Sequence, residues 1–173
     1  MSPTPINNPK ELFVALLSNV RQGHERTTEI FKELSKIAER PEVKEALEAR
    51  VFVSDKTLAI LDECFKLTGE KPVKTSGRLH DVFVEDFRKE LAEIQSPVVR
   101  HLFILAKAKQ LIHLRIAEYI ALIEMADMTG HFAVGVLLES CLADKLAFAE
   151  RTRRLIRHIV APEVGKKLVA SAA

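Results

Sequence analysis

Four long stretches of the chain place apolar residues three and four positions apart, and this spacing limits the fold more than any other feature. The stretches begin near Pro9, Pro41, Pro97 and Phe132. Three of these starts are prolines, which suit the first turn of a helix because that turn does not use the missing N–H. Each stretch predicts a helix of roughly 28 to 31 residues, about 42 to 46 Å long, so the helices must cover one another's apolar faces.

The links between these stretches indicate how the helices are connected. The first link, ERPEV, and the last, MTGH, are short, and short links join antiparallel neighbours. The middle link is longer and contains an amphipathic segment, HDVFVEDFRKELAEI, with room to run along the side of a bundle. The sequence therefore predicts an all-α, ferritin-like four-helix bundle of two antiparallel helical hairpins, with a long crossover carrying a short extra helix.

The length of 173 residues suits one domain. We expect the bundle at residues 10–160, a flexible N-terminus at 1–9, and a tail at 161–173, because Pro162 is expected to end the fourth helix near Val160. The start of the chain lacks the basic segment and apolar run of a signal peptide, and no stretch approaches about 18 uncharged apolar residues. These features predict a cytoplasmic protein without a membrane span.

Several classes of function have little support in the sequence. Cys64 and Cys141 lie in apolar helical patterns without motif spacing, so we expect small core residues rather than a disulfide or a metal pair. The chain has no GxSxG, CxxC or HExxH motif and no glycine-rich phosphate loop, which argues against an enzyme. Its basic run at 150–158 lacks interleaved aromatic residues, so we expect it to complement the helix dipole rather than to bind nucleic acid.

Five short segments of the sequence resemble those of a known family: LFVALLSN, PEVKEALEA, FKLTGEKP, KQLIHLRIAEY and LLESCLADKLA. Together they make the chain similar, from about residue 11 to 158, to the YciE/YciF family of bacterial ferritin-like proteins. The resemblance implies a four-helix ferritin-like fold and an association with bacterial stress. It also implies carboxylate and histidine ligands on facing helices, suited to two metal ions.

At the positions where that family carries ligands, this chain has other residues. In the first predicted helix, Gly23, His24 and Glu25 stand where the family has AEK, and in the second, Arg50 and Val53 stand where it has His-x-x-Glu. In the third, Ile112 to Arg115 replace EHYE. In the fourth, Ala143 to Lys145 replace the family's acidic run. A guanidinium cannot coordinate a cation, and an aliphatic side chain offers no lone pair. We therefore expect the dinuclear centre to be absent and the protein to hold no cofactor.

Our leading hypothesis is that Arg50 and Arg115 replace the metal ions as fixed cations. A buried charge needs a partner, and Glu118 lies three residues after Arg115 on the same helix face. Asp144 lies at the depth where the family's acidic run begins, so it is the expected partner of Arg50. His24 is in line with inward-facing apolar residues and is expected to be a hydrogen-bonded core residue that completes this remnant site.

Three alternatives stay open. Arg50 and Arg115 can instead lie on the flank of the bundle with their charged ends in water. A second alternative is an altered site for iron or manganese, whose ligands are His24, Glu118 and Asp144, with Glu25, His113 or Glu139 as helpers. The third is a cavity beside the arginines that binds a small anionic or apolar ligand.

A possible partner surface lies in the second predicted helix, where Val51, Phe52 and Val53 follow one another. At least one of them must point away from the core, and exposed apolar residues on a long helix often mark an interface. Together with the family resemblance, this favours a homodimer through the first two helices, with Val51 and Phe52 at its surface. Scattered surface hydrophobics are the alternative. The sequence thus predicts a non-enzymatic structural or interaction protein, with a further, unidentified protein partner possible.

Overall fold

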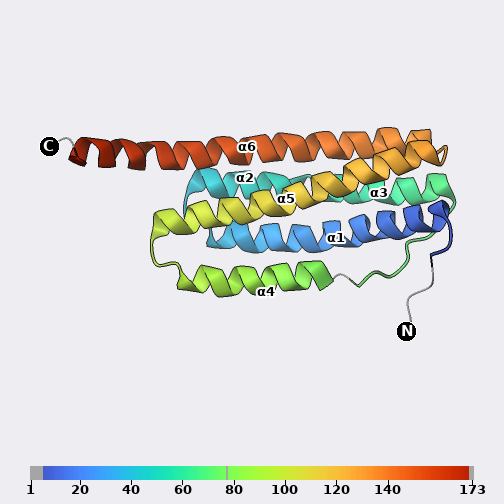
Figure 1. Ribbon diagram of the computed structural model, residues 1–173, viewed down its shortest axis with the longest axis horizontal. Coiled ribbons are helices and arrows are strands. Elements are labelled where there is room, and N and C mark those ends of the chain that lie inside the picture. Colours follow the sequence, from blue (N-terminus) through green and yellow to red (C-terminus); the bar gives the residue numbers. More distant parts are fainter. Residues whose placement is uncertain (1–5, 77, 172–173) are drawn as a thin grey trace.

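The computed structural model describes residues 6–76 and 78–171. Its helices are α1 (Pro9–Ile37), α2 (Pro41–Phe52), α3 (Ser54–Thr68), α4 (Arg78–Glu93), α5 (Pro97–Met128) and α6 (Phe132–Ser171). Figure 1 shows α1, α6 and the α2–α3 pair running along the long axis, with α5 crossing obliquely in front of α2 and α3 and α4 lying along the outside of α1. The all-α, ferritin-like bundle of two hairpins with a helical crossover is confirmed.

The ends of the helices follow from local chemistry. The Asn8 side chain accepts a hydrogen bond from the Glu11 backbone N–H and caps α1, whose first residue is Pro9. At the other end of the first hairpin, Gly69 has a φ of 69° and closes α3 in the left-handed conformation. Gly130, with a φ of 77°, makes the tight turn between α5 and α6. The predicted helix start at Pro9 and the predicted short turn at MTGH are therefore both present.

The second predicted helix is not continuous, which corrects the sequence expectation. It is interrupted at Val53, where the backbone has a ψ of 0°, and α3 begins again at Ser54. The interruption brings Ser54 against α1, where its hydroxyl lies 2.6 Å from the Thr28 hydroxyl and 3.0 Å from His24 Nε2. These polar contacts between helices stabilise a break that apolar periodicity alone does not reveal.

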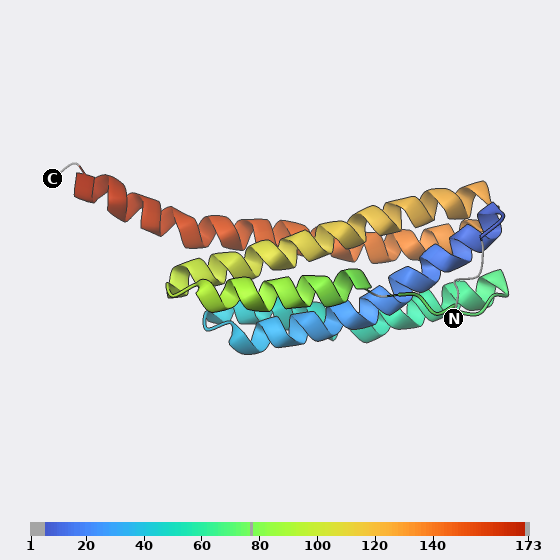
Figure 2. The same cartoon turned by 60° about the horizontal axis from the view of Figure 1, so that its bottom comes forward.

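The predicted end of the fourth helix near Val160 is also wrong, because α6 continues through Pro162 to Ser171. Proline removes one N–H···O bond from a helix but does not prevent the chain from remaining helical on both sides. Figures 1 and 2 show the last turns of α6 extending past the ends of the other helices. The division into residues 10–160 and a separate tail stays a prediction, although α6 runs across that boundary.

The interior consists of two apolar clusters, one toward each end of the bundle. The cluster around Phe31, Leu47 and Leu105 fills the half where α1 meets α2. The cluster around Phe13, Leu61 and Leu122 fills the opposite half, and both cysteines are buried there as free thiols, as predicted. Between the clusters lies a layer of buried polar side chains, described below. None of the described helices is long and apolar enough to cross a membrane.

Candidate functional site: a buried cationic layer

Three cationic side chains of the described residues lie in the middle of the bundle. Arg50 from α2 is 5% exposed, Arg115 from α5 is 1% exposed, and Lys145 from α6 is fully buried. The alternative that the two arginines point into water from the flank is therefore wrong. Both guanidinium groups occupy the interior, at positions where the family resemblance implies metal ligands.

Arg115 lies against α1 because that helix has no side chain at Gly23. A Cβ atom built on Gly23 overlaps Arg115 Nη1 and lies 3.0 Å from Arg115 Cζ and 2.9 Å from His80 Cε1. Arg115 forms the predicted ion pair with Glu118, with 2.8 Å between Nη1 and Oε2. That contact is not aligned as a hydrogen bond, so the three guanidinium nitrogens of Arg115 remain without a hydrogen-bond partner. Gly23 thus makes the space that the buried guanidinium fills.

Arg50 does not form the direct pair with Asp144 that the sequence suggested. No carboxylate oxygen of the described residues lies within 4.0 Å of its nitrogens, and its Nε and Nη1 are buried without a partner. Burial lowers the pKa of Arg50, and the negative charge of Asp144 acts in the opposite direction. Both side chains line one cleft between α2 and α6, so Asp144 acts on Arg50 at longer range.

Lys145 is a member of this layer that our reasoning from the sequence missed. Its ammonium group donates a hydrogen bond to the Cys141 carbonyl (3.2 Å) and lies 3.9 Å from the centre of the Tyr119 ring, a cation–π contact. Burial, together with the positive charge of Arg50, lowers its pKa to about 7. A signal was present, because Lys145 falls in the same helical register as the buried Leu138 and Phe148.

His24 is buried and hydrogen-bonded, as predicted. Its Nε2 lies 3.0 Å from the Ser54 hydroxyl and 3.2 Å from the Ser54 carbonyl oxygen, which accepts from the ring N–H. Burial lowers the pKa of His24 to about 3, and the charges of Arg50 and Lys145 add to this effect. The imidazole is therefore neutral and already bonded at one nitrogen.

The residues of the alternative metal site do not form a ligand set. Among residues 6–76 and 78–171, no three His, Cys, Asp or Glu side chains are placed to hold an ion. Glu118 contacts Arg115, and His24 contacts Ser54. The helpers lie at the surface: Glu25 pairs with Arg21 at 2.9 Å, and His113 and Glu139 are exposed. The two guanidinium groups of this layer repel a divalent cation and cannot coordinate it, and the Glu118 carboxylate is already paired with Arg115.

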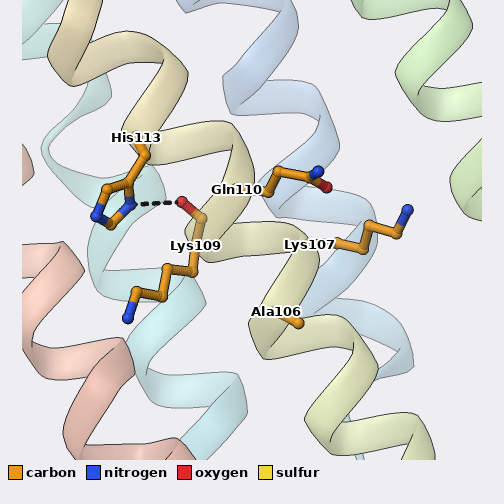
Figure 3. A pocket seen from close by; sticks show the side chains of 5 residues that line it. All are labelled: Ala106, Lys107, Lys109, Gln110 and His113. Carbon is orange, nitrogen blue, oxygen red and sulfur yellow. Dashed lines mark hydrogen bonds between the residues drawn. The ribbon is translucent and has the colours of Figure 1, made fainter.

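A shallow hollow around His113 is separate from the cationic layer. Figure 3 shows His113 on the surface of α5, with its Nδ1–H donating to the Lys109 carbonyl at 2.8 Å. The Gln110 and Lys107 side chains point away from the imidazole. Among the residues that line this hollow, no set of functional groups converges on His113.

The basic run at the end of the bundle is partly neutralised by carboxylates. Arg153 and Arg154 both contact Glu150, and Arg151 reaches Glu45 on α2 at 2.9 Å. The expectation that this run does not bind nucleic acid stays a prediction.

Comparisons with known proteins agree with this architecture. Residues 8–165 match the family described as a domain of unknown function, DUF892. The chain belongs to this family. The Escherichia coli stress protein YciF superposes with a TM-score of 0.84 at 19% identity, covering 90% of this chain and 99% of that one. The predicted resemblance to the YciE/YciF group is confirmed. No curated protein matches the sequence.

Two further solved structures share the fold. YcfI from Rhodopseudomonas palustris has a TM-score of 0.83 at 22% identity, covering 88% of this chain and 98% of that one. Ferritin-like, diiron-carboxylate proteins from Bacillus anthracis have a TM-score of 0.65 at 16% identity, covering 87% of this chain and 99% of the other. At these identities the similarity shows the ferritin-like fold.

Proposed function

We propose that this protein is a non-catalytic, cytoplasmic member of its family that acts through association with other chains. In this proposal, Arg50 and Arg115 are fixed cations where ferritin-like relatives hold metal ions, and Lys145 is buried in the same layer. The observation that carries the proposal is that these three side chains are at least 95% buried in the middle of the bundle. Metal-dependent chemistry needs side chains that can coordinate the ion, whereas guanidinium and ammonium groups offer no lone pair for it.

Electrostatics supports this proposal. Two unit charges 4 Å apart repel by about 4 kcal/mol at an effective dielectric of 20, so a divalent ion beside one guanidinium meets about 8 kcal/mol. The layer supplies few anions to offset that repulsion. Glu118 is already paired with Arg115, and Asp144 is the remaining carboxylate beside Arg50. The proposed Arg–carboxylate replacement therefore consists of one close pair and one longer-range pair.

The test is the metal content of the purified protein, with a revertant as the positive control. We expect far less than one equivalent of iron, manganese or zinc per chain. The revertant carries Arg50→His, Val53→Glu, Ile112→Glu and Arg115→Glu, which restore the ligand types that the family resemblance implies for the second and third predicted helices. It should gain metal. A stoichiometric transition metal in the unchanged protein contradicts the proposal.

We also propose a homodimer through α1 and α2. Phe52 is 88% exposed, whereas Val51 is half-buried and packs against an apolar cluster, so Phe52 is the stronger candidate contact. Sedimentation velocity should show a dimer that Phe52→Ser weakens. Phe132→Ser is the matched control, since Phe132 is 66% exposed on α6, away from the proposed surface. An unchanged dimer in the Phe52 variant contradicts this interface.

A role in bacterial stress completes the proposal. Its support is the fold shared with YciF, which is described as a stress protein. Abundance of the protein in its host should rise under osmotic or oxidative stress. Constant abundance, with no growth defect in a deletion strain, argues against this role.

A further inference from the structure

The cleft between α2 and α6 combines a small volume with an unused group of hydrogen-bond donors. Its volume is about 190 Å³, and it is lined by Ala46, Ala49, Arg50, Val53, Asp144, Ala147, Phe148 and Arg151. A single water needs roughly 10 to 15 Å³ of such space, whereas pockets for drug-sized ligands span roughly 300 to 1,000 Å³. The cleft therefore suits a ligand of only a few heavy atoms.

Arg50 determines the chemistry of that ligand. Only 5% of the Arg50 surface is exposed, and its Nε and Nη1 have no hydrogen-bond partner. Leaving a buried donor unpaired is costly, and a guanidinium carries only donors. Arg50 lines the cleft, so an acceptor that enters it lies beside a guanidinium whose buried nitrogens lack a hydrogen-bond partner. The missing partner is an oxygen-rich anion rather than a cation or an apolar group.

The residues that line the cleft carry two positive charges, on Arg50 and Arg151, and one negative charge, on Asp144. Arg151 lies at its outer part, 43% exposed and paired with Glu45, and Lys145 is buried near enough to Arg50 for their charges to interact. Asp144 is the opposing carboxylate in the lining. Because Asp144 repels any anion, it limits both affinity and the charge that the cleft accepts. The small side chains of Ala49 and Ala147 leave the space in which such an anion fits.

We propose that the α2–α6 cleft binds a small oxyanion, either inorganic phosphate or the carboxylate of a small metabolite. Arg50 is its main donor and Arg151 its outer contact. The apolar walls made by Ala46 and Phe148 exclude larger anions. This binding site is independent of the non-catalytic role and of the dimer, because neither places a ligand beside Arg50.

The test is a titration with potassium phosphate and then with potassium acetate, each balanced with potassium chloride to constant ionic strength. Binding is followed by the amide shifts of Ala49 and Ala147 in isotope-edited spectra of the full chain. We expect saturable shifts at these two amides that chloride alone does not produce. Acetate responding without phosphate identifies carboxylate as the ligand class, and the reverse identifies phosphate.

Variants separate the cleft from general attraction to a basic surface. Arg50→Met should weaken binding by about tenfold or more, since a hydrogen bond to a charged group contributes at least that factor. Arg151→Met should weaken it less. Asp144→Asn should tighten it by roughly threefold or more, because a like charge is removed. Arg157→Met, an exposed change on the same helix, should have no effect.

Three results overturn the proposal: shifts that chloride reproduces, shifts spread along the basic surface of α6, or equal binding by Arg50→Met and the unchanged protein. If Arg50→Met does not fold, the oxyanion affinities of Arg151→Met and Asp144→Asn test the proposal instead. Unchanged affinity in both variants then contradicts it. Weaker binding of Mn²⁺ by Asp144→Asn, with no response to oxyanions, identifies a cation site instead. The oxyanion titration tests the oxyanion site, and the Mn²⁺ titration tests the absence of metal from the layer, so the two claims can fail independently.

Discussion

The two apolar ends of the bundle and the cationic layer between them are stabilised in opposite ways. At the ends, side chains such as Leu47 and Leu61 are fully buried among other hydrophobic groups, so their burial contributes directly to stability. In the middle, Arg50 and Lys145 are buried just as deeply but lose water without gaining full hydrogen bonding. Burial alone therefore does not measure stabilisation. In the same bundle, burial of the apolar ends stabilises the fold, whereas burial of the cationic layer costs free energy.

The largest effect is expected at an apolar end. Leu47→Ala should lower the free energy of unfolding by about 2 to 5 kcal/mol, because it removes fully buried methyl groups and leaves a cavity. Urea unfolding followed by circular dichroism measures this change. The control is Leu146→Ala, at a position that is 51% exposed, where the change should be small. Similar losses for both variants contradict the assignment of the core.

The opposite sign is expected in the middle. In a buffer without oxyanions, Arg50→Met should raise the free energy of unfolding by about 1 to 4 kcal/mol, since it replaces a buried, unpaired charge with an apolar group of similar length. Arg157→Met is the matched control and should be neutral. Clear destabilisation by Arg50→Met shows that the guanidinium has partners and removes the contrast between the two regions.

A smaller effect tests how Arg115 is accommodated. Gly23→Ala should destabilise by about 1 to 3 kcal/mol, because the added methyl group overlaps the guanidinium, and this exceeds the helix preference for alanine. In an Arg115→Met background the penalty should shrink, so the two changes are not additive. Thermal and urea unfolding of the four proteins complete this double-mutant cycle. Full additivity indicates that Gly23 does not make room for Arg115.

The most gradual effect is a pH dependence that comes from Lys145. Its pKa is about 7 in the folded protein and 10.5 ordinarily, so between these values the unfolded chain binds a proton that the folded chain does not. The free energy of unfolding therefore rises with pH in this window, by up to about 1.4 kcal/mol per unit, and the cost of the buried charge is fully present below pH 7.

The measurement compares unfolding of the unchanged protein and Lys145→Met from pH 7 to 9. That upper limit avoids the thiols of Cys64 and Cys141, whose raised pKa values act in the opposite direction above their ordinary value of 9.0. The rise should disappear in Lys145→Met and persist in Lys56→Met, an exposed control. Parallel pH profiles for all three proteins show that Lys145 is charged or accessible.

The apolar ends were the predictable part of the molecule. Phe13, Leu17 and Phe31 repeat at helical spacing, and prolines mark where three of the helices begin. These two local signals are enough to predict the bundle. The break at Val53 was missed because it depends on contacts between Ser54 and α1, which are distant in sequence. Likewise, the Arg115–Glu118 pair was predictable from a three-residue spacing, whereas a partner for Arg50 depends on how two helices rotate against each other.

The cationic layer was predictable only by comparison with a family pattern. Arg50 and Arg115 were predicted to be important because they stand where the family has metal ligands. Lys145 was overlooked, since we had assigned no ligand to its position. Gly23 was noticed only as a departure from AEK, and its role as space for Arg115 follows from the three-dimensional contact. Sequence periodicity thus predicts where side chains point, and it does not predict which charges meet there.

Anomalous diffraction at the manganese edge, from crystals equilibrated with MnCl₂, tests most directly whether cationic side chains replace metal ions here. We predict no anomalous peak between α1, α2, α5 and α6, with Arg50, Arg115 and Lys145 ordered in the interior. A strong peak in that position, with Arg50 and Arg115 turned toward the solvent, is the result that contradicts this account.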